Sequence, residues 1–277
     1  MSTTTIHRLP AGHTLRLGLS RVAYEVRSYF RQGDSVFFTF LFPLLFLTIF
    51  SVAFSSQSFG APGEEISAAA FYLPGMLAAG LLLSGLQNMA IDIAGEKGDG
   101  TLKRFAGTPL PVMSYFIGKI GQVLVTGILQ AALLLIVARV VFQVELPTEP
   151  GKWLTFAWVF LLGVTTCAVL GIALSGLPRS GKSATAVIIP ITLVLQFISG
   201  VYLSFSQLPE WLQNFASIFP LKWMAQGMRE VFLPASFEVL EQNESWNLPG
   251  VALVTGLWLV IGLIVCRLTF RWIRKDS

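Results

Sequence analysis

One segment of the sequence has the residue types and the spacing of a nucleotide-binding loop. Residues 176–183, Gly-Leu-Pro-Arg-Ser-Gly-Lys-Ser, fit the P-loop pattern G-x-x-x-x-G-K-[ST]. In a P-loop the backbone amides and the lysine hold phosphates, the hydroxyl group holds Mg²⁺, and the loop joins a strand to a helix. Here the flanking segments, 153–177 and 184–203, are long apolar runs. We therefore expect a tight basic turn between two membrane helices, and no ATP binding by this motif.

Other side chains that could support catalysis or metal binding are few and scattered. The two histidines, His7 and His13, lie in the N-terminal tail and belong to no cluster with the spacing of metal ligands. No Ser-His-Asp arrangement is apparent. The sequence therefore predicts no catalytic residue and no metal site, and we do not expect the chain to be an enzyme by itself.

The composition indicates a membrane protein. Of the 277 residues, 54% are hydrophobic and 12% are charged, whereas a soluble domain carries about 25% charged residues. The mean hydropathy is +0.69. The net charge is +4, but the basic residues are scattered among apolar runs and form no basic face, which argues against nucleic-acid binding.

Apolar segments of the length needed to cross a bilayer define the domain organisation. A transmembrane helix needs about 20 mainly apolar residues, and a helix satisfies its own backbone hydrogen bonds in lipid. The sequence predicts an all-α integral membrane protein, with a six-span transmembrane domain over residues 35–277. The predicted spans are residues 35–54, 69–93, 112–142, 153–177, 184–203 and 248–270.

The basic residues also predict the orientation of these spans. Most of the Lys and Arg residues lie in the two termini and in the loops on the same side as the termini. Because Lys and Arg are enriched in cytoplasmic loops, both termini are expected in the cytoplasm. We therefore expect a multi-pass protein of the plasma or inner membrane.

Residues 1–34 are predicted to form a cytoplasmic tail and an amphipathic helix. Leu15, Leu19, Val22 and Val26 recur at steps of three and four residues, which places them on one helical face. This helix could lie on the membrane surface with its arginines facing lipid phosphates, or it could also touch a cytoplasmic partner. The arginines assigned to this interface helix are Arg21, Arg27 and Arg31.

The cytoplasmic loop 94–111 contains a second candidate contact surface. Thr101 could cap a short helix on which Leu102 and Phe105, three residues apart, share a face. A pair of exposed apolar residues flanked by charges suits docking into a groove of another protein. An ordinary solvated loop is the alternative interpretation.

Segment 205–247, on the outer side, contains two short apolar stripes that include Trp211 and Trp223. Each is too short to span the membrane, so short re-entrant or interfacial helices before the last span are predicted. Trp residues at a membrane boundary are usually anchors, although an outer gate is the bolder interpretation.

Polar side chains within the predicted spans are either interhelical hydrogen-bond partners or part of a substrate path. Asp92 lies near the cytoplasmic boundary, where we expect it to be solvated. The residues that we assign to a candidate substrate path are Phe38, Phe42, Gln87, Asn88, Gln196, Trp211 and Trp223.

Three stretches of the sequence resemble those of the ABC-2 family of ABC-transporter membrane subunits. Residues 96–102, Glu-Lys-Gly-Asp-Gly-Thr-Leu, resemble the family's E-x-x-x-G-T-L stretch, and Thr108-Pro109-Leu110-Pro111 follows at the expected spacing. Ser199-Gly200-Val201 and Phe219-Pro220-Leu221 resemble the outer-loop pattern, and Phe42-Pro43-Leu44 resembles a third stretch.

The resemblance implies the membrane subunit of an ATP-driven exporter of a drug, lipid or glycolipid. Two separate ATPase subunits would bind ATP and Mg²⁺, and this chain would bind no cofactor. The complex would also contain a second copy or a sister permease. Loop 94–111 would hold a coupling helix that receives the movement of the ATPase. The residues that the resemblance assigns to coupling are Glu96, Lys97, Gly100, Thr101, Leu102, Arg104 and Phe105.

Two other functions remain open from the residues alone. An ion-coupled secondary transporter would favour charged residues near the bilayer midplane and broken helices in related halves of the chain, and neither is clear in this sequence. A non-transporting membrane scaffold or immunity protein would not need Leu102 and Phe105 for transport.

Overall fold

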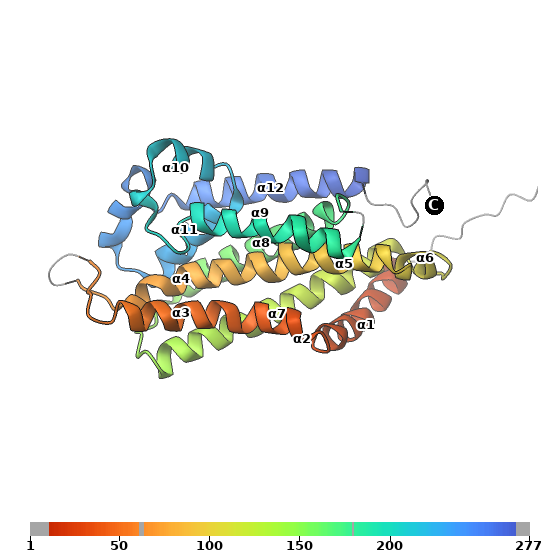
Figure 1. Cartoon of the computed structure of the whole chain (residues 1–277), viewed down its shortest axis with the longest axis horizontal. Coiled ribbons are helices and arrows are strands. Elements are labelled where there is room, and N and C mark those ends of the chain that lie inside the picture. Colours follow the sequence, from red (N-terminus) through yellow and green to blue (C-terminus); the bar gives the residue numbers. More distant parts are fainter. Residues whose placement is uncertain (1–10, 61–63, 179, 270–277) are drawn as a thin grey trace, which may run out of the picture.

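The computed structural model describes residues 11–60, 64–178 and 180–269 and is a bundle of long helices (Figure 1). Within these ranges the extended backbone pairing is a single antiparallel bridge between Phe59 and Ile66. The main helices are α1 (Ala11–Tyr29), α2 (Gly33–Val36), α3 (Phe42–Ala53), α4 (Ala68–Leu81), α5 (Met89–Gly98), α6 (Thr101–Ala106), α7 (Val112–Val140), α8 (Pro150–Leu174), α9 (Gly181–Ile198), α10 (Glu210–Ala216), α11 (Pro220–Phe232) and α12 (Leu248–Thr269).

Among the described residues, five helices are long and apolar enough to cross a membrane. They are Gly33–Ala53, Ala68–Gly98, Val112–Val140, Pro150–Leu174 and Leu248–Leu268. The segment predicted as the fifth of six spans forms the shorter apolar helix α9. The prediction of an all-α membrane protein is therefore confirmed. Helix α8 ends at Leu174, just before the motif at residues 176–183, so a helix precedes the motif where a P-loop requires a strand.

The helix formed by α4 and α5 is the centre of the bundle. Most of its length is buried by neighbouring helices, and its glycines allow these helices to approach closely. A side chain at Gly85 would lie 2.6 Å from the Cβ of Cys167, and one at Gly171 would lie 2.4 Å from the Gly85 carbonyl oxygen. Close contact through small residues is a common way of packing membrane helices. Residues Leu82–Asn88 form a π-helical stretch between α4 and α5.

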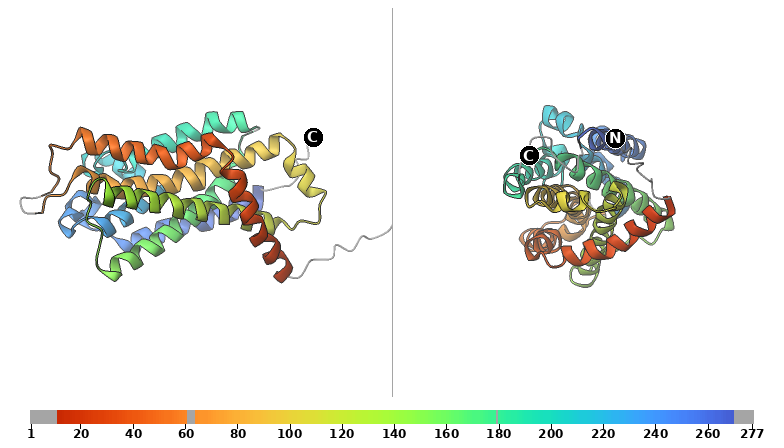
Figure 2. Two further views of the ribbon diagram at one scale, coloured as in Figure 1. Left: turned by 90° about the horizontal axis from the view of Figure 1, so that it is seen from below. Right: turned by 90° about the vertical axis from the view of Figure 1, so that its right-hand side faces the viewer.

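Helix α1 crosses the end of the bundle obliquely and packs against α7 (Figure 2). Gly18 of α1 meets Ile117, and Gly121 of α7 meets Val22. Leu15 and Leu19 of the same helix are exposed. The amphipathic N-terminal helix predicted from the sequence is thus present, and one of its faces is anchored on α7.

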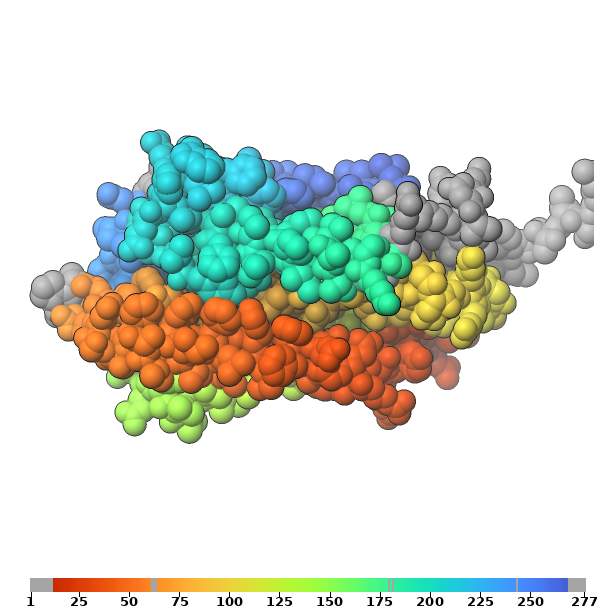
Figure 3. Space-filling view, in the orientation of Figure 1, coloured from red at the N-terminus to blue at the C-terminus, as the bar shows by residue number. Residues whose placement is uncertain are grey.

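One long face of the bundle is apolar and exposed. Figure 3 shows side chains of α3 (orange) and α9 (green to teal) at this surface. Exposed residues on it include Leu45 and Ile49 of α3, and Val187 and Val194 of α9. Contiguous apolar exposure of this kind is expected where a membrane protein contacts lipid or another membrane subunit.

The short helices α10 and α11 precede α12, in the segment where the sequence predicts short helices. Helix α11 is largely buried and contacts α4, α8 and α12. Both lie at the end of the bundle opposite α6 (Figure 1). Their placement as re-entrant helices relative to a bilayer stays a prediction.

Candidate functional site

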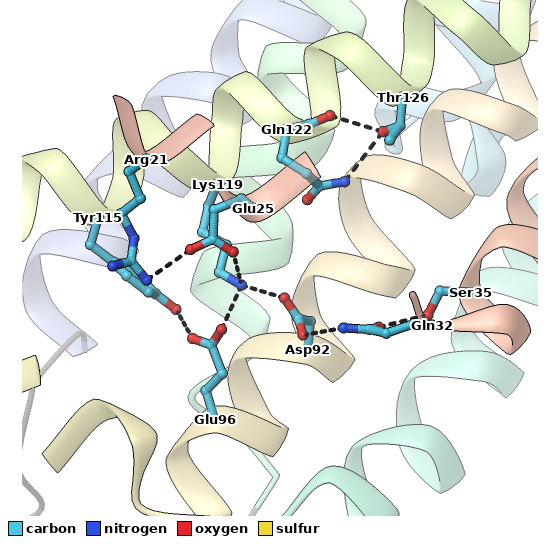
Figure 4. A network of polar contacts seen from close by, with 10 residues as sticks. All are labelled: Arg21, Glu25, Gln32, Ser35, Asp92, Glu96, Tyr115, Lys119, Gln122 and Thr126. Atoms are coloured by element: carbon cyan, nitrogen blue, oxygen red, sulfur yellow. Dashed lines mark hydrogen bonds and ion pairs between the residues drawn. The ribbon is translucent and has the colours of Figure 1, made fainter. Parts of the chain in front are cut away.

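A buried lysine near the α6 end of the bundle is surrounded by three carboxylates from two helices. The side chain of Lys119, on α7, is 1% exposed. Its Nζ atom lies 3.0 Å from Glu25 Oε2 of α1 and 2.7 Å from Glu96 Oε1 of α5, and it also pairs with Asp92 of α5 (Figure 4). This lysine therefore ties α1, α5 and α7 together.

A second set of contacts holds these carboxylates in place. The hydroxyl group of Tyr115 donates a hydrogen bond to Glu96 Oε2 at 2.6 Å, and Arg21 Nη2 lies 2.8 Å from Glu25 Oε1. A long hydrogen bond of 3.5 Å joins Gln32 Nε2 to Asp92 Oδ1. The name ion-pair cluster is used below for Arg21, Glu25, Asp92, Glu96 and Lys119.

The ion-pair cluster can be buried because each of its three carboxylates is paired with one or both of its two cations, and one carboxylate, Asp92, stays partly exposed. Isolated charges are very costly to remove from water. Replacing a buried ion pair with apolar residues of similar volume often leaves stability unchanged or raises it. Removing only one partner, however, typically lowers the free energy of unfolding by about 3–5 kcal/mol. The cluster is therefore better understood as a specific junction of three helices than as a source of net stability.

The same carboxylates have the spacing of a metal site. One oxygen from each of Glu25, Asp92 and Glu96 lies within 4.8 Å of the others. The Lys119 ammonium contacts all three carboxylates, so it occupies the place that a cation would take. These three carboxylates thus already pair with a cation of the chain itself, the Lys119 ammonium group.

Helix α6 begins next to this cluster, and its start is set by Asp99 and Gly100. Gly100 adopts a left-handed backbone conformation, with φ of 81°, which glycine enters without steric cost. Asp99 Oδ1 accepts a hydrogen bond of 2.8 Å from the Thr101 amide. Hydrogen bonding from Thr101, first through its side chain and then through this amide, holds the pKa of Asp99 below its usual value. The prediction that Thr101 caps the helix is wrong, because Thr101 is its first residue.

The expectation of an exposed apolar pair on α6 is also wrong. Leu102 is 1% exposed and belongs to the main buried core, and Phe105 lies under the guanidinium group of Arg21, 4.3 Å from its Cζ atom. The exposed side chains of α6 are Lys103 and Arg104. A partner that approaches α6 would therefore meet two cations, while Leu102 faces the core of the helix bundle.

The other residues that the sequence assigned to coupling or to the interface helix lie in different surroundings. Lys97 donates hydrogen bonds to the backbone and side-chain oxygens of Ser175, at 3.1 and 3.3 Å, and so links α5 to the end of α8. Arg27 and Arg31 are exposed. Arg21 is thus the arginine of the interface helix that enters the ion-pair cluster.

Sequence reasoning missed Glu25, Tyr115 and Lys119, and it placed Asp92 in solvent. Asp92 is partly exposed, 30% for its side chain, but it is paired with Lys119. The signal that could have found the site is Lys119 itself, because an ionisable residue within a membrane span indicates a functional site.

The residues assigned to a substrate path are not gathered around one cavity. Gln87 accepts a hydrogen bond from Thr192 Oγ1 at 2.5 Å, Asn88 donates to Thr39 Oγ1 at 2.6 Å, and Gln196 accepts from the Tyr202 hydroxyl group at 2.6 Å. These three amides therefore make hydrogen bonds between helices or to a loop, and their assignment to a substrate path stays a prediction. Exposed or partly exposed positions are occupied by Phe38, Phe42, Trp211 and Trp223.

Comparison with known protein families identifies this arrangement. The family model described as "ABC-2 type transporter" matches residues 20–233, which include the second half of α1, the ion-pair cluster, α6 and α11. The chain belongs to the ABC-2 type transporter family. It is therefore a permease, the membrane subunit of such a transporter.

Two curated proteins of Escherichia coli illustrate the relationship of this ABC-2 permease to others. It is 22% identical over 186 residues to "Probable multidrug ABC transporter permease YbhR", a match that covers 67% of this chain and 50% of YbhR. It is 22% identical over 193 residues to "Inner membrane transport permease YadH", covering 69% of this chain and 74% of YadH. The permease thus spans about half the length of YbhR.

Proposed function

We propose that this permease is driven by a separate ATPase and that the ion-pair cluster transmits the movement of that ATPase into the bundle. The observation that carries the proposal is the position of Lys119, which pairs with α1 on one side and with α5 on the other. Helices α5 and α7 then continue through the bundle as two of the membrane-spanning segments.

The proposed transmission of movement from the ATPase begins at the exposed surface of α6. Lys103 and Arg104 offer two cations to an acidic surface of the ATPase, and complementary charge favours both encounter and register. Movement of α6 acts on α1 through the contact of Phe105 with Arg21. Arg21 pairs with Glu25, and Glu25 pairs with Lys119. In this proposal Glu96 acts inside the permease, where Tyr115 and Lys119 hold it, and does not touch the ATPase.

The complex would contain two ATPase subunits and a second permease, either another copy or a sister chain. ATP and Mg²⁺ would be bound by the ATPase, and both termini of the permease would lie in the cytoplasm. Substrate would be moved outward, as a hydrophobic or amphipathic drug, lipid or glycolipid. The name of YbhR describes that relative as a probable multidrug permease, and the apolar character of this chain is consistent with the drug alternative.

Affinity purification in mild detergent from the native host tests the proposal. A Walker-motif ATPase should co-purify in a ratio near 1:1, and the double variant Lys103→Glu/Arg104→Glu should lose it while Arg27→Glu, on the exposed side of α1, retains it. If no ATPase co-purifies and vesicles with the permease alone move solutes along an ion gradient, the proposal is wrong and the permease is a secondary transporter.

A further inference from the structure

A cavity of about 620 Å³ lies at the end of the bundle opposite α6. It is formed by the loop after α3, the start of α4, residues 202–207 and the segment 235–240 (Figure 1). Its volume is in the range of small-molecule sites. None of the residues that the sequence assigned to a substrate path lines it.

Aromatic rings dominate the wall of this cavity. Six of its described lining residues are aromatic: Phe54, Phe59, Phe71, Tyr72, Tyr202 and Phe237. Several of these rings hold one another in place. Phe59 and Phe71 are stacked with their centres 4.6 Å apart, and Phe54 and Tyr72 are stacked at 6.1 Å. The cavity defined by these six residues is called the aromatic cavity below.

The polar groups of the aromatic cavity are neutral. They are two amides, Gln57 and Gln207, and the hydroxyl groups of Ser58, Ser204 and Ser236. Among the described lining residues there is no Asp, Glu, Lys or Arg. Burial raises the pKa of Tyr202 to about 12, so this phenol keeps its proton at neutral pH. A ligand can therefore find hydrogen-bond partners in this cavity but no counter-charge.

The charged pair that lies nearest to the aromatic cavity, Arg229 and Glu241, does not supply a counter-charge for a ligand. Arg229 and Glu241 line a smaller adjoining void, and they pair with each other. The residues that this void shares with the aromatic cavity are Phe71, Tyr72, Leu203, Ser204, Phe237 and Leu240. Arg229 also donates to the Gly200 carbonyl oxygen at 3.0 Å. A charged ligand in the aromatic cavity would lose its hydration without gaining an ion pair, which is unfavourable. An anion would gain nothing in return, and a cation would recover only part of this loss through contacts with the aromatic rings.

We propose that the aromatic cavity binds a neutral, planar aromatic molecule that carries a hydroxyl or amide group, and that this class of compound is the cargo of the permease. The rings provide stacking surfaces, and the glutamine and serine side chains provide hydrogen bonds. As a cargo site the aromatic cavity rests on the proposed export function, whereas binding can be tested with the permease alone.

The test measures protection of an introduced cysteine by three pyrene probes of different charge. The permease, with Cys167 and Cys266 replaced by alanine, is placed in phosphatidylcholine nanodiscs, and Ser58→Cys reports on the aromatic cavity. Pyrenebutanol is neutral, pyrenebutyrate is anionic and pyrenebutyl-trimethylammonium is cationic. Thr148→Cys, exposed in the loop between α7 and α8, lines a separate cavity that contains charged residues, so it reports whether the same probes bind elsewhere on the permease.

Saturating pyrenebutanol should slow the reaction of Ser58→Cys with a water-soluble maleimide at least five-fold and leave Thr148→Cys unchanged. Phe59→Leu should raise the half-protecting concentration about three- to ten-fold, the loss expected for one aromatic contact. Phe215→Leu, an exposed phenylalanine of α10 outside the aromatic cavity, should not change it. Protection by the charged probes should need much higher concentrations.

Equal or better protection by the cationic or anionic probe would contradict the proposal that the aromatic cavity prefers a neutral ligand. Three results would contradict binding in the aromatic cavity. They are no protection of Ser58→Cys, equal slowing of Thr148→Cys, and no effect of Phe59→Leu. No ATPase is present in this assay. Protection by pyrenebutanol combined with failure to co-purify an ATPase would therefore reject the export proposal and leave the binding site standing.

Discussion

The guanidinium group of Arg21 lies over the ring of Phe105, 4.3 Å from its centre, and the same group pairs with Glu25. One side chain of α1 thus touches α6 and also enters the buried charges of the bundle. Arginine suits this position because its planar group can stack on a ring and form an ion pair at the same time.

Replacement of Arg21 by lysine should loosen α6 without removing the charge beside Glu25. A cation–π contact contributes about 0.5–1 kcal/mol at exposed sites, so we expect amide hydrogen exchange in residues 101–106 to become about two- to five-fold faster. Arg27→Lys, at an exposed position of the same helix, is the matched control and should leave this exchange unchanged. Equal rates in Arg21→Lys and the wild type would show that the stacking does not hold α6.

Replacement of Lys119 by methionine should destabilise the permease strongly. Three carboxylates would lose their shared cation, and breaking a buried ionic group typically costs about 3–5 kcal/mol. The thermal unfolding midpoint in detergent should fall accordingly, whereas Lys103→Met, an exposed change, should alter stability by no more than about 0.5 kcal/mol. An unchanged midpoint for Lys119→Met would contradict the ion-pair cluster as described.

The two faces of α6 should respond differently to charge. Leu102→Asp places a carboxylate in the buried core, so the yield of folded permease should drop sharply. Lys103→Glu/Arg104→Glu should leave the unfolding midpoint unchanged and weaken binding of the co-purifying ATPase about ten-fold or more. The size-exclusion profile and the thermal unfolding midpoint are measured for each variant. The affinity for the ATPase is then measured for the variants that fold. A well-folded Leu102→Asp variant would show that Leu102 is not a core residue.

Lys222 of α11 should make stability depend on pH in the alkaline range. Burial lowers its pKa from 10.5 to about 8, so between these values the unfolded chain binds more protons at this site than the folded one. Stability should therefore rise as pH increases from about 8 to 10.5. Lys222→Met should flatten the pH dependence of the unfolding midpoint in that window. An identical profile in both proteins would mean that Lys222 keeps an ordinary pKa in the fold.

The sequence predicts the helices of this permease well because their signals are local. Apolar length indicates the spans, and the spacing of Leu15, Leu19 and Val22 indicates the amphipathic α1. The partners of Lys119 are not local: Glu25 is supplied by α1 and Glu96 by α5. The burial of Leu102 likewise depends on how the helices assemble, and spacing within loop 94–111 does not contain that information.

The central claim is that the ion-pair cluster joins α1 to α7 so that nucleotide-driven movement reaches the outer end. Val22 and Gly121 offer a direct test, since a side chain at Gly121 would lie 3.4 Å from the Cβ of Val22, close to the spacing of a disulfide. The readout is hydrogen exchange of segment 205–247, with and without ATP and vanadate, in the complex with the ATPase.

Glu25→Gln should remove the nucleotide-dependent difference in exchange, and a Val22→Cys/Gly121→Cys disulfide in that variant should restore it until dithiothreitol is added. The same disulfide in the otherwise wild-type permease should leave the difference intact. A difference that persists in Glu25→Gln, or that disappears when α1 is cross-linked to α7 in the wild-type background, would contradict the claim.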